Sequence, residues 1–275
     1  MNTTARPNGF RSRSVMIVIA VLFFLVESHA FAQQHPAPEF TVGIELPPQI
    51  PIAPAVESAL HDMGITFMNY YVKPDLWTPD ETAVRINKEM LDLVQRLDVD
   101  FAIACYSTDP PESCVKEAVQ RGKVDEGVTR FKGVIFDELE HCRLIYNHAP
   151  TPLADTSHFT TLSEAYEGTL EGYRNLKAVH ASNSAPAIAT HIWPVLLHVA
   201  ARAGFTPCPK ICKELYSSVS LAIGMGAALQ YGTEFWANCD LWFWDMIPGH
   251  PADEFKSNLL LAYWLGVVRL YVEGC

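Results

Sequence analysis

The sequence lacks the short motifs that identify several large enzyme classes. It contains no HExxH pair for a zinc hydrolase, no G-x-S-x-G turn for an α/β-hydrolase and neither a G-x-G-x-x-G turn nor a Walker phosphate loop. No pair of its cysteines has zinc-finger spacing, and no H-x-H pair lies on its first predicted strand. We therefore expect neither a bound metal nor a cofactor.

Positive charge is also scarce in this chain. Its 275 residues include 20 Lys and Arg against 31 Asp and Glu, which gives a formal net charge of -11. A protein of that charge is repelled by nucleic acid and by anionic membrane surfaces. We expect a partner of neither kind.

Long apolar runs are rare, and the clearest one lies near the N-terminus. Arg6, Arg11 and Arg13 precede an apolar run from Val15 to Val26, and Ala30-Phe31-Ala32 follows it. This order is typical of a secretory signal peptide with an A-x-A cleavage site. A retained membrane anchor is the alternative, but the run is shorter than the ~20 residues that a spanning helix needs. The sequence predicts a signal peptide over residues 1–32 and a secreted or periplasmic domain over 33–275, without stable membrane insertion after cleavage.

The rest of the chain alternates predicted strands with predicted helices. Alternation of this kind indicates parallel strands joined by right-handed crossovers. It predicts a (β/α)8 barrel, because no glycine-rich phosphate turn follows the first strand to support a doubly wound sheet. The predicted strands are 40–44, 65–72, 99–106, 133–136, 186–193, 227–234 and 267–273.

These strands number seven, one fewer than a closed barrel requires. An open barrel would expose two unpaired edges. Either a strand is missed, for which Leu241 to Ile247 is the candidate, or the barrel is truncated after its seventh strand. The sequence favours truncation, so we expect a barrel that is incomplete at its C-terminal end.

The most informative stretch is FKGVIFDELEH, residues 131–141. Its apolar run is typical of a strand buried on both faces, and it stops at Asp137 and Glu138. In barrels the carboxyl ends of the strands carry the chemistry. The alternative is that both carboxylates open the next helix, where negative charge suits the helix dipole. Glu234 and Glu273 repeat the pattern downstream and favour the chemical interpretation.

Carboxylates from separate strand ends would meet aromatic side chains at one mouth. Glycoside hydrolysis needs one carboxylic acid to protonate the leaving oxygen and one carboxylate to attack or to activate water. The candidate catalytic pair is Glu138 and Glu273. The candidate substrate contacts are Glu45, Tyr70, Tyr71, His191, Trp193, Tyr231 and Trp236. Each has a plainer interpretation, such as a hydrogen-bonded histidine or ordinary aromatic packing.

This layout resembles the retaining glycoside hydrolases of the large (β/α)8-barrel clan. In that clan the acid/base Glu ends strand four and the nucleophile Glu ends strand seven, places that Glu138 and Glu273 occupy in our count. The clan usually carries Asn before the acid/base residue, whereas this chain has Asp137. If the count is wrong by one strand, Glu234 becomes the partner of Glu138, and Asp137 is a further alternative. The resemblance implies a secreted glycoside hydrolase acting on a carbohydrate. A non-catalytic carbohydrate-binding barrel or an inactive fragment is the alternative.

Overall fold

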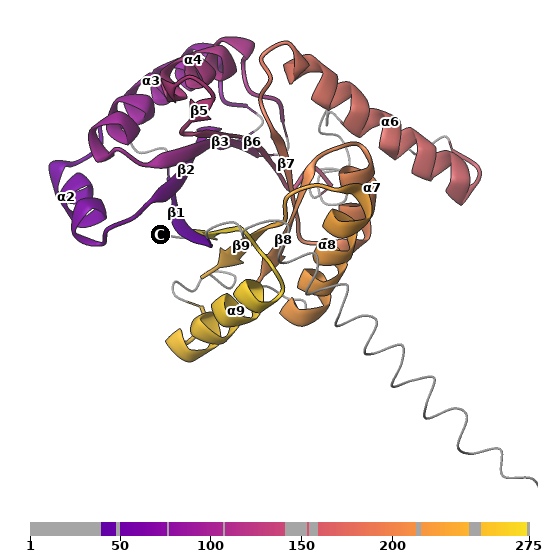
Figure 1. The fold of residues 1–275 in the computed structure, drawn as a ribbon. Coiled ribbons are helices and arrows are strands. Elements are labelled where there is room, and N and C mark those ends of the chain that lie inside the picture. Colours follow the sequence, from indigo (N-terminus) through magenta and orange to yellow (C-terminus); the bar gives the residue numbers. More distant parts are fainter. Residues whose placement is uncertain are drawn as a thin grey trace, which may run out of the picture. The chain divides into compact units, whose positions relative to one another are not determined.

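The structure is a computed structural model. It describes residues 40–47, 50–75, 77–106, 108–140, 153, 159–212, 216–241 and 249–273. Eight parallel strands close into a barrel in the order β1-β2-β3-β6-β7-β8-β9-β10, with the helices around its outside (Figure 1). The predicted barrel fold is confirmed. Among the described residues, no helix combines the length and apolar character that crossing a bilayer requires.

The elements alternate along the chain as the sequence predicts. The barrel strands are β1 (Thr41–Leu46), β2 (Phe67–Lys73), β3 (Asp100–Tyr106), β6 (Phe131–Asp137), β7 (Ala187–His191), β8 (Thr206–Ile211), β9 (Trp236–Asp240) and β10 (Arg269–Glu273). The helices are α2 (Pro54–Asp62), α3 (Asp80–Leu97), α4 (Glu112–Gly122), α6 (Leu162–Ala181), α7 (Leu197–Arg202), α8 (Ser217–Tyr231) and α9 (Ala252–Trp264), with a short 3-10 helix η1 (Pro194–Leu196). A small antiparallel pair, β4 (Lys123–Asp125) and β5 (Val128–Thr129), lies outside the barrel sheet.

The expected open edge after a seventh strand is wrong. The last strand, β10, is the eighth strand of the barrel, and it pairs with β9 on one side and with β1 on the other. Two strands were missed, β9 and β8. The sequence of β8 is TPCPKI, and its two prolines remove backbone donors and imitate a loop. Its Cys208 joins the barrel interior, whereas Pro209 lies against Gly224 of α8.

The predicted strand at 227–234 is also wrong. Residues up to Tyr231 belong to α8, and Gly232 ends that helix in a left-handed conformation. Small and apolar residues fill α8, so its sequence carries little of the alternation with polar residues that marks a surface helix. The alternative strand at Leu241 to Ile247 lies outside the described residues except for Leu241.

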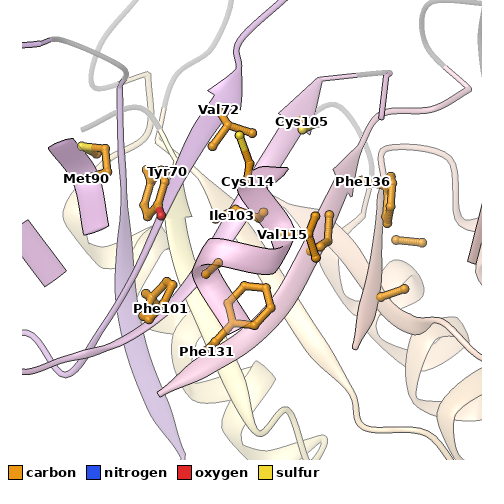
Figure 2. Close-up of a cluster of buried hydrophobic side chains, with 14 of the residues drawn as sticks. Tyr70, Val72, Met90, Phe101, Ile103, Cys105, Cys114, Val115, Phe131 and Phe136 are labelled. Atoms are coloured by element: carbon orange, nitrogen blue, oxygen red, sulfur yellow. The ribbon is translucent and has the colours of Figure 1, made fainter. Parts of the chain in front are cut away.

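Side chains alternate between the inside and the outside of the barrel wall. Phe67 and Tyr71 of β2 join the interior cluster, whereas Tyr70 and Val72 join the layer between strands and helices. Figure 2 shows part of this outer layer, where Tyr70, Phe101, Phe131 and Phe136 from the strands lie near Met90, Cys114 and Val115 from α3 and α4.

The barrel interior changes character along its axis. Near the amino ends of the strands, the Arg269 guanidinium lies 4.9 Å from the ring centre of Trp236 and 5.3 Å from that of Phe67. Apolar side chains such as Ala102, Ile135 and Ile188 also fill the interior. Toward the carboxyl ends of the strands the interior becomes polar, and the candidate site begins there.

Candidate active site

Five carboxylates lie at the carboxyl ends of four barrel strands. Asp137, Asp240 and Glu273 are the last residues of β6, β9 and β10, Glu138 follows β6, and Glu45 is the next-to-last residue of β1. All except Glu273 are buried, and the Glu273 side chain is only 12% exposed. A closed parallel barrel brings the carboxyl ends of all its strands to one mouth, so these groups share a site.

Lys210 of β8 is the centre of this cluster. Its Nζ lies 2.7 Å from Glu273 Oε2, 2.8 Å from Glu138 Oε1 and 3.3 Å from Asp137 Oδ1. Burial acts to lower the pKa of Lys210, but the attraction of Asp137, Asp240, Glu138 and Glu273 outweighs it and raises the pKa well above its usual range. The side chain is therefore an ammonium. Sequence reasoning missed it because residue 210 lies in none of the predicted strands.

Asp137 faces the barrel interior. It accepts a hydrogen bond from the Tyr71 hydroxyl at 2.6 Å, besides its contact with Lys210. Burial raises its pKa well above the usual range, and the charges of Glu138 and Glu273 add to this against the opposing effect of Lys210. Asp137 therefore keeps its proton to a higher pH than an ordinary aspartic acid does.

Glu138 turns its carboxylate back into the barrel. Its φ of +48° is a left-handed backbone conformation that is uncommon for a residue other than glycine. The side chain contacts Lys210, which favours a site carboxylate over the alternative of a helix-capping carboxylate. Burial and the neighbouring Asp137 carboxyl disfavour the charged form of Glu138, whereas the ion pair with Lys210 favours it.

Two asparagines hold carboxylates in place. Asn69 Nδ2 donates to Glu45 Oε2 at 3.1 Å, and Asn238 Nδ2 donates to Glu273 Oε2 at 3.0 Å. Their Oδ1 atoms are buried and accept no hydrogen bond from the described residues. Burial raises the pKa of Glu45 well above its usual range, with further contributions from the charges of Glu273 and Asp137.

His191 fits the plainer interpretation of a satisfied histidine. It is buried at the end of β7, where Nδ1 contacts Glu140 Oε2 and Nε2 lies 2.7 Å from the Tyr173 hydroxyl. Glu140 Oε1 also accepts from the backbone N–H of Ile192, at 3.1 Å. Trp193, two residues on, is 43% exposed and remains a candidate substrate contact.

Four predicted rim residues lie elsewhere. Tyr70 points outward, and its hydroxyl donates to Asn87 Oδ1 of α3 at 3.2 Å. Tyr231 ends α8, outside the barrel. Trp236 begins β9 instead of following a strand, and its indole N–H donates to Glu234 Oε2 at 2.8 Å. Glu234 therefore lies at the amino end of the barrel, opposite the mouth. The false strand at 227–234 caused three of these errors.

The corrected strand count also changes the match to the retaining clan. Glu138 still follows strand four, but Glu273 now ends strand eight, and strand seven ends with Asp240. Asp240 and Glu273 are register partners on adjacent strands. Among the described residues, no group of three or more His, Cys, Asp or Glu side chains has an arrangement that could hold a metal ion.

Comparison with known proteins identifies the fold and leaves the family open. No family model matches the chain, and no curated protein matches it by sequence. It is similar to 3-keto-D-glucoside 4-epimerase from E. coli, with a TM-score of 0.51 and 11% identity over 86% of this chain and 92% of that one. It is also similar to deoxyribose phosphate aldolase from Aeropyrum pernix, with a TM-score of 0.48 and 10% identity over 84% of each chain. A glycoside hydrolase family 5 enzyme from Prevotella bryantii is similar as well, with a TM-score of 0.47 and 10% identity over 86% of this chain and 89% of that one. Likeness at these identities shows the barrel fold alone.

Proposed function

We propose that this chain is a glycoside hydrolase that cleaves a glycosidic bond between two carboxyl groups at the mouth of the barrel. One observation carries the proposal: Glu138 and Glu273, from strands four and eight, both contact Lys210 Nζ, at 2.8 and 2.7 Å. Their contacting oxygens can therefore be no further apart than the sum of these distances, which lies below the ~6.5–9.5 Å between the carboxyls of inverting enzymes.

In this mechanism Glu273 is the nucleophile. Lys210 and Asn238 both donate to its Oε2, which favours the ionised carboxylate and fixes its orientation. Glu138 is the acid that protonates the leaving oxygen. Burial and the neighbouring Asp137 carboxyl favour the protonated form of Glu138 that this step needs, against the opposing charge of Lys210. Water then hydrolyses the glycosyl-enzyme bond with Glu138 acting as base.

Kinetics of two variants test this assignment. We expect Glu138→Gln to slow substrates with poor leaving groups about 10²–10⁴-fold, the usual size of general acid catalysis, and activated aryl glycosides far less. Glu273→Gln should slow both substrates. Asp240→Asn is the matched comparison, because Asp240 holds the strand-seven place. A larger loss with Asp240→Asn than with Glu273→Gln would reassign the nucleophile. Saccharide binding without turnover by the unaltered protein would favour a non-catalytic carbohydrate-binding barrel.

We also propose that the protein is exported, on the strength of the N-terminal pattern that ends at Ala32. N-terminal sequencing of the exported protein should begin at Gln33. Full-length chain in a membrane fraction would contradict export with cleavage.

A further inference from the structure

The glycosidase mechanism does not by itself require a lysine inside the barrel. Lys210 is 2% exposed and contacts carboxylates from β6, from the residue after it and from β10. Burying such an ion pair seldom adds net stability, because the cost of removing the charges from water is comparable to their attraction. A role in the chemistry of the site is the better explanation.

Two chemical roles are open to a buried lysine. A nucleophilic lysine that forms a Schiff base needs a neutral amine, and therefore a lowered pKa. Here the surrounding carboxylates raise the pKa of Lys210 well above its usual range, and three of them lie within 3.3 Å of its Nζ. Nucleophilic catalysis by Lys210 does not fit this environment, whereas electrostatic control of the carboxylates does.

We propose that Lys210 is a positioning residue that holds Glu138 and Glu273 in place across the barrel mouth and keeps Glu273 ionised for the proposed glycosidase reaction. The side chain links the fourth strand to the eighth through one atom, so it fixes the separation of the pair and favours the charged form of Glu273. This inference rests on the proposed function for its consequence in catalysis, but its electrostatic content can be measured without turnover.

The catalytic test uses Lys210→Met, which keeps the length of the side chain and removes its charge. With an activated aryl glycoside the reaction needs little acid catalysis, so the acidic limb of the kcat/KM profile reports ionisation of the nucleophile. An opposite charge at this distance is worth about 1–3 pKa units, so the limb should move to higher pH by that amount, a loss of tenfold or more on the acid side. Lys210→Arg should keep the limb near its original position.

Lys73→Met is the matched control. Lys73 lies at the end of β2 with its side chain 14% exposed, and its Nζ forms an ion pair with Asp80 of α3 at 2.7 Å, outside the cluster. It should leave the profile unchanged. If Lys210→Met and Lys73→Met give the same profile as the unaltered enzyme, Lys210 has no positioning role.

A second readout separates this inference from the proposed function. Carboxyl ¹³C resonances of Glu273, assigned with Glu273→Gln, should titrate at higher pH in Lys210→Met than in the unaltered protein. If that shift occurs and no saccharide is hydrolysed, the proposed function fails and the role of Lys210 in the cluster stands. If Lys210→Met does not fold, the comparison is made with Lys210→Gln. An unshifted titration, or reductive trapping of a carbonyl compound on Lys210 near neutral pH, would overturn the inference.

Discussion

At the scale of single residues, Glu45 makes the stability of this protein depend on pH. Burial, then the charges of Glu273 and Asp137, raise its pKa well above the ordinary value of 4.5. A raised carboxyl pKa contributes stability that is fully present below the ordinary value and is lost as pH rises through the folded-state value. Glu45→Gln removes this titration. We expect the variant to gain free energy of unfolding relative to the unaltered protein as pH rises above about 4.5, as measured by urea unfolding across a pH series.

Glu57→Gln supplies the control with the opposite sign. Glu57 of α2 accepts two hydrogen bonds from Arg96 at 2.8 Å, and these lower its pKa. The stability it contributes is present above the unfolded-state pKa and is lost as pH falls. Because the pair is exposed, its effect should be small. Parallel pH profiles for the two Gln variants would contradict the assignment of a raised pKa to Glu45.

Sequence reasoning located the residues whose position depends only on where a strand ends. Asp137, Glu138, Glu45 and Glu273 were predicted in that way and lie in the cluster. Tyr70 and Tyr71 show the limit of this reasoning, because both follow the same apolar run. Only the alternation of side chains along β2 decides that Tyr71 contacts Asp137 inside the barrel and that Tyr70 points outward to Asn87. Asp240 was missed because β9 was not predicted as a strand. Lys210, Asn69 and Asn238 lie inside strands, where a buried polar residue is recognised only once its partners are known.

At the scale of elements, Gly133 allows β6 to sit against β7. Its φ is +133°, and a Cβ built there would lie 2.4 Å from the Pro186 carbonyl oxygen and 2.7 Å from Ile188 Cδ1. It also lies next to the shift in register between β3 and β6. Gly133→Ala should therefore lower the free energy of unfolding by about 1–3 kcal/mol through backbone strain and by about 1–3 kcal/mol more through overpacking. Denaturant unfolding measures the loss.

Gly127→Ala separates these two contributions. Gly127 also has a positive φ, +80°, but a Cβ there would meet nothing within 4 Å. The free energy of unfolding of Gly127→Ala should fall only by the cost of a left-handed conformation for alanine, about 1–2 kcal/mol. Equal losses for the two alanine variants would show that the contact of β6 with Pro186 and Ile188 is not tight.

Two of the mistakes in strand assignment, at β8 and at the end of α8, have one physical origin. Strands in a parallel barrel are covered on both faces, so they lack the alternation of polar and apolar residues that marks a half-exposed strand. β8, with Pro207 and Pro209, looked like a loop, and the apolar end of α8 looked like a buried strand. The predicted fold class survived these errors, because it depends on alternation along the chain and not on any one element.

At the scale of the whole molecule, closure of the barrel depends on β10. Val272 is register partner to Ile44 of β1 and to Cys239 of β9, so β10 is a central strand with no free edge. Proline there removes a backbone donor and is tolerated only at sheet edges. We expect Val272→Pro to open the barrel, bind a hydrophobic dye and lose cooperative thermal unfolding, whereas the unaltered protein should melt in a single transition with little dye bound.

Val128→Pro tests whether the effect belongs to the barrel or to proline itself. Val128 is 55% exposed in β5, which pairs only with β4 in the small antiparallel sheet outside the barrel. Its proline variant should keep cooperative unfolding and low dye binding, because the eight-stranded ladder is untouched. If Val272→Pro also melts cooperatively, the β1–β10 contact is dispensable, and the position of Glu273 opposite Glu138 must then be held by Lys210 and Asn238 alone. That outcome would place the integrity of the site in its side-chain contacts and not in closure of the sheet.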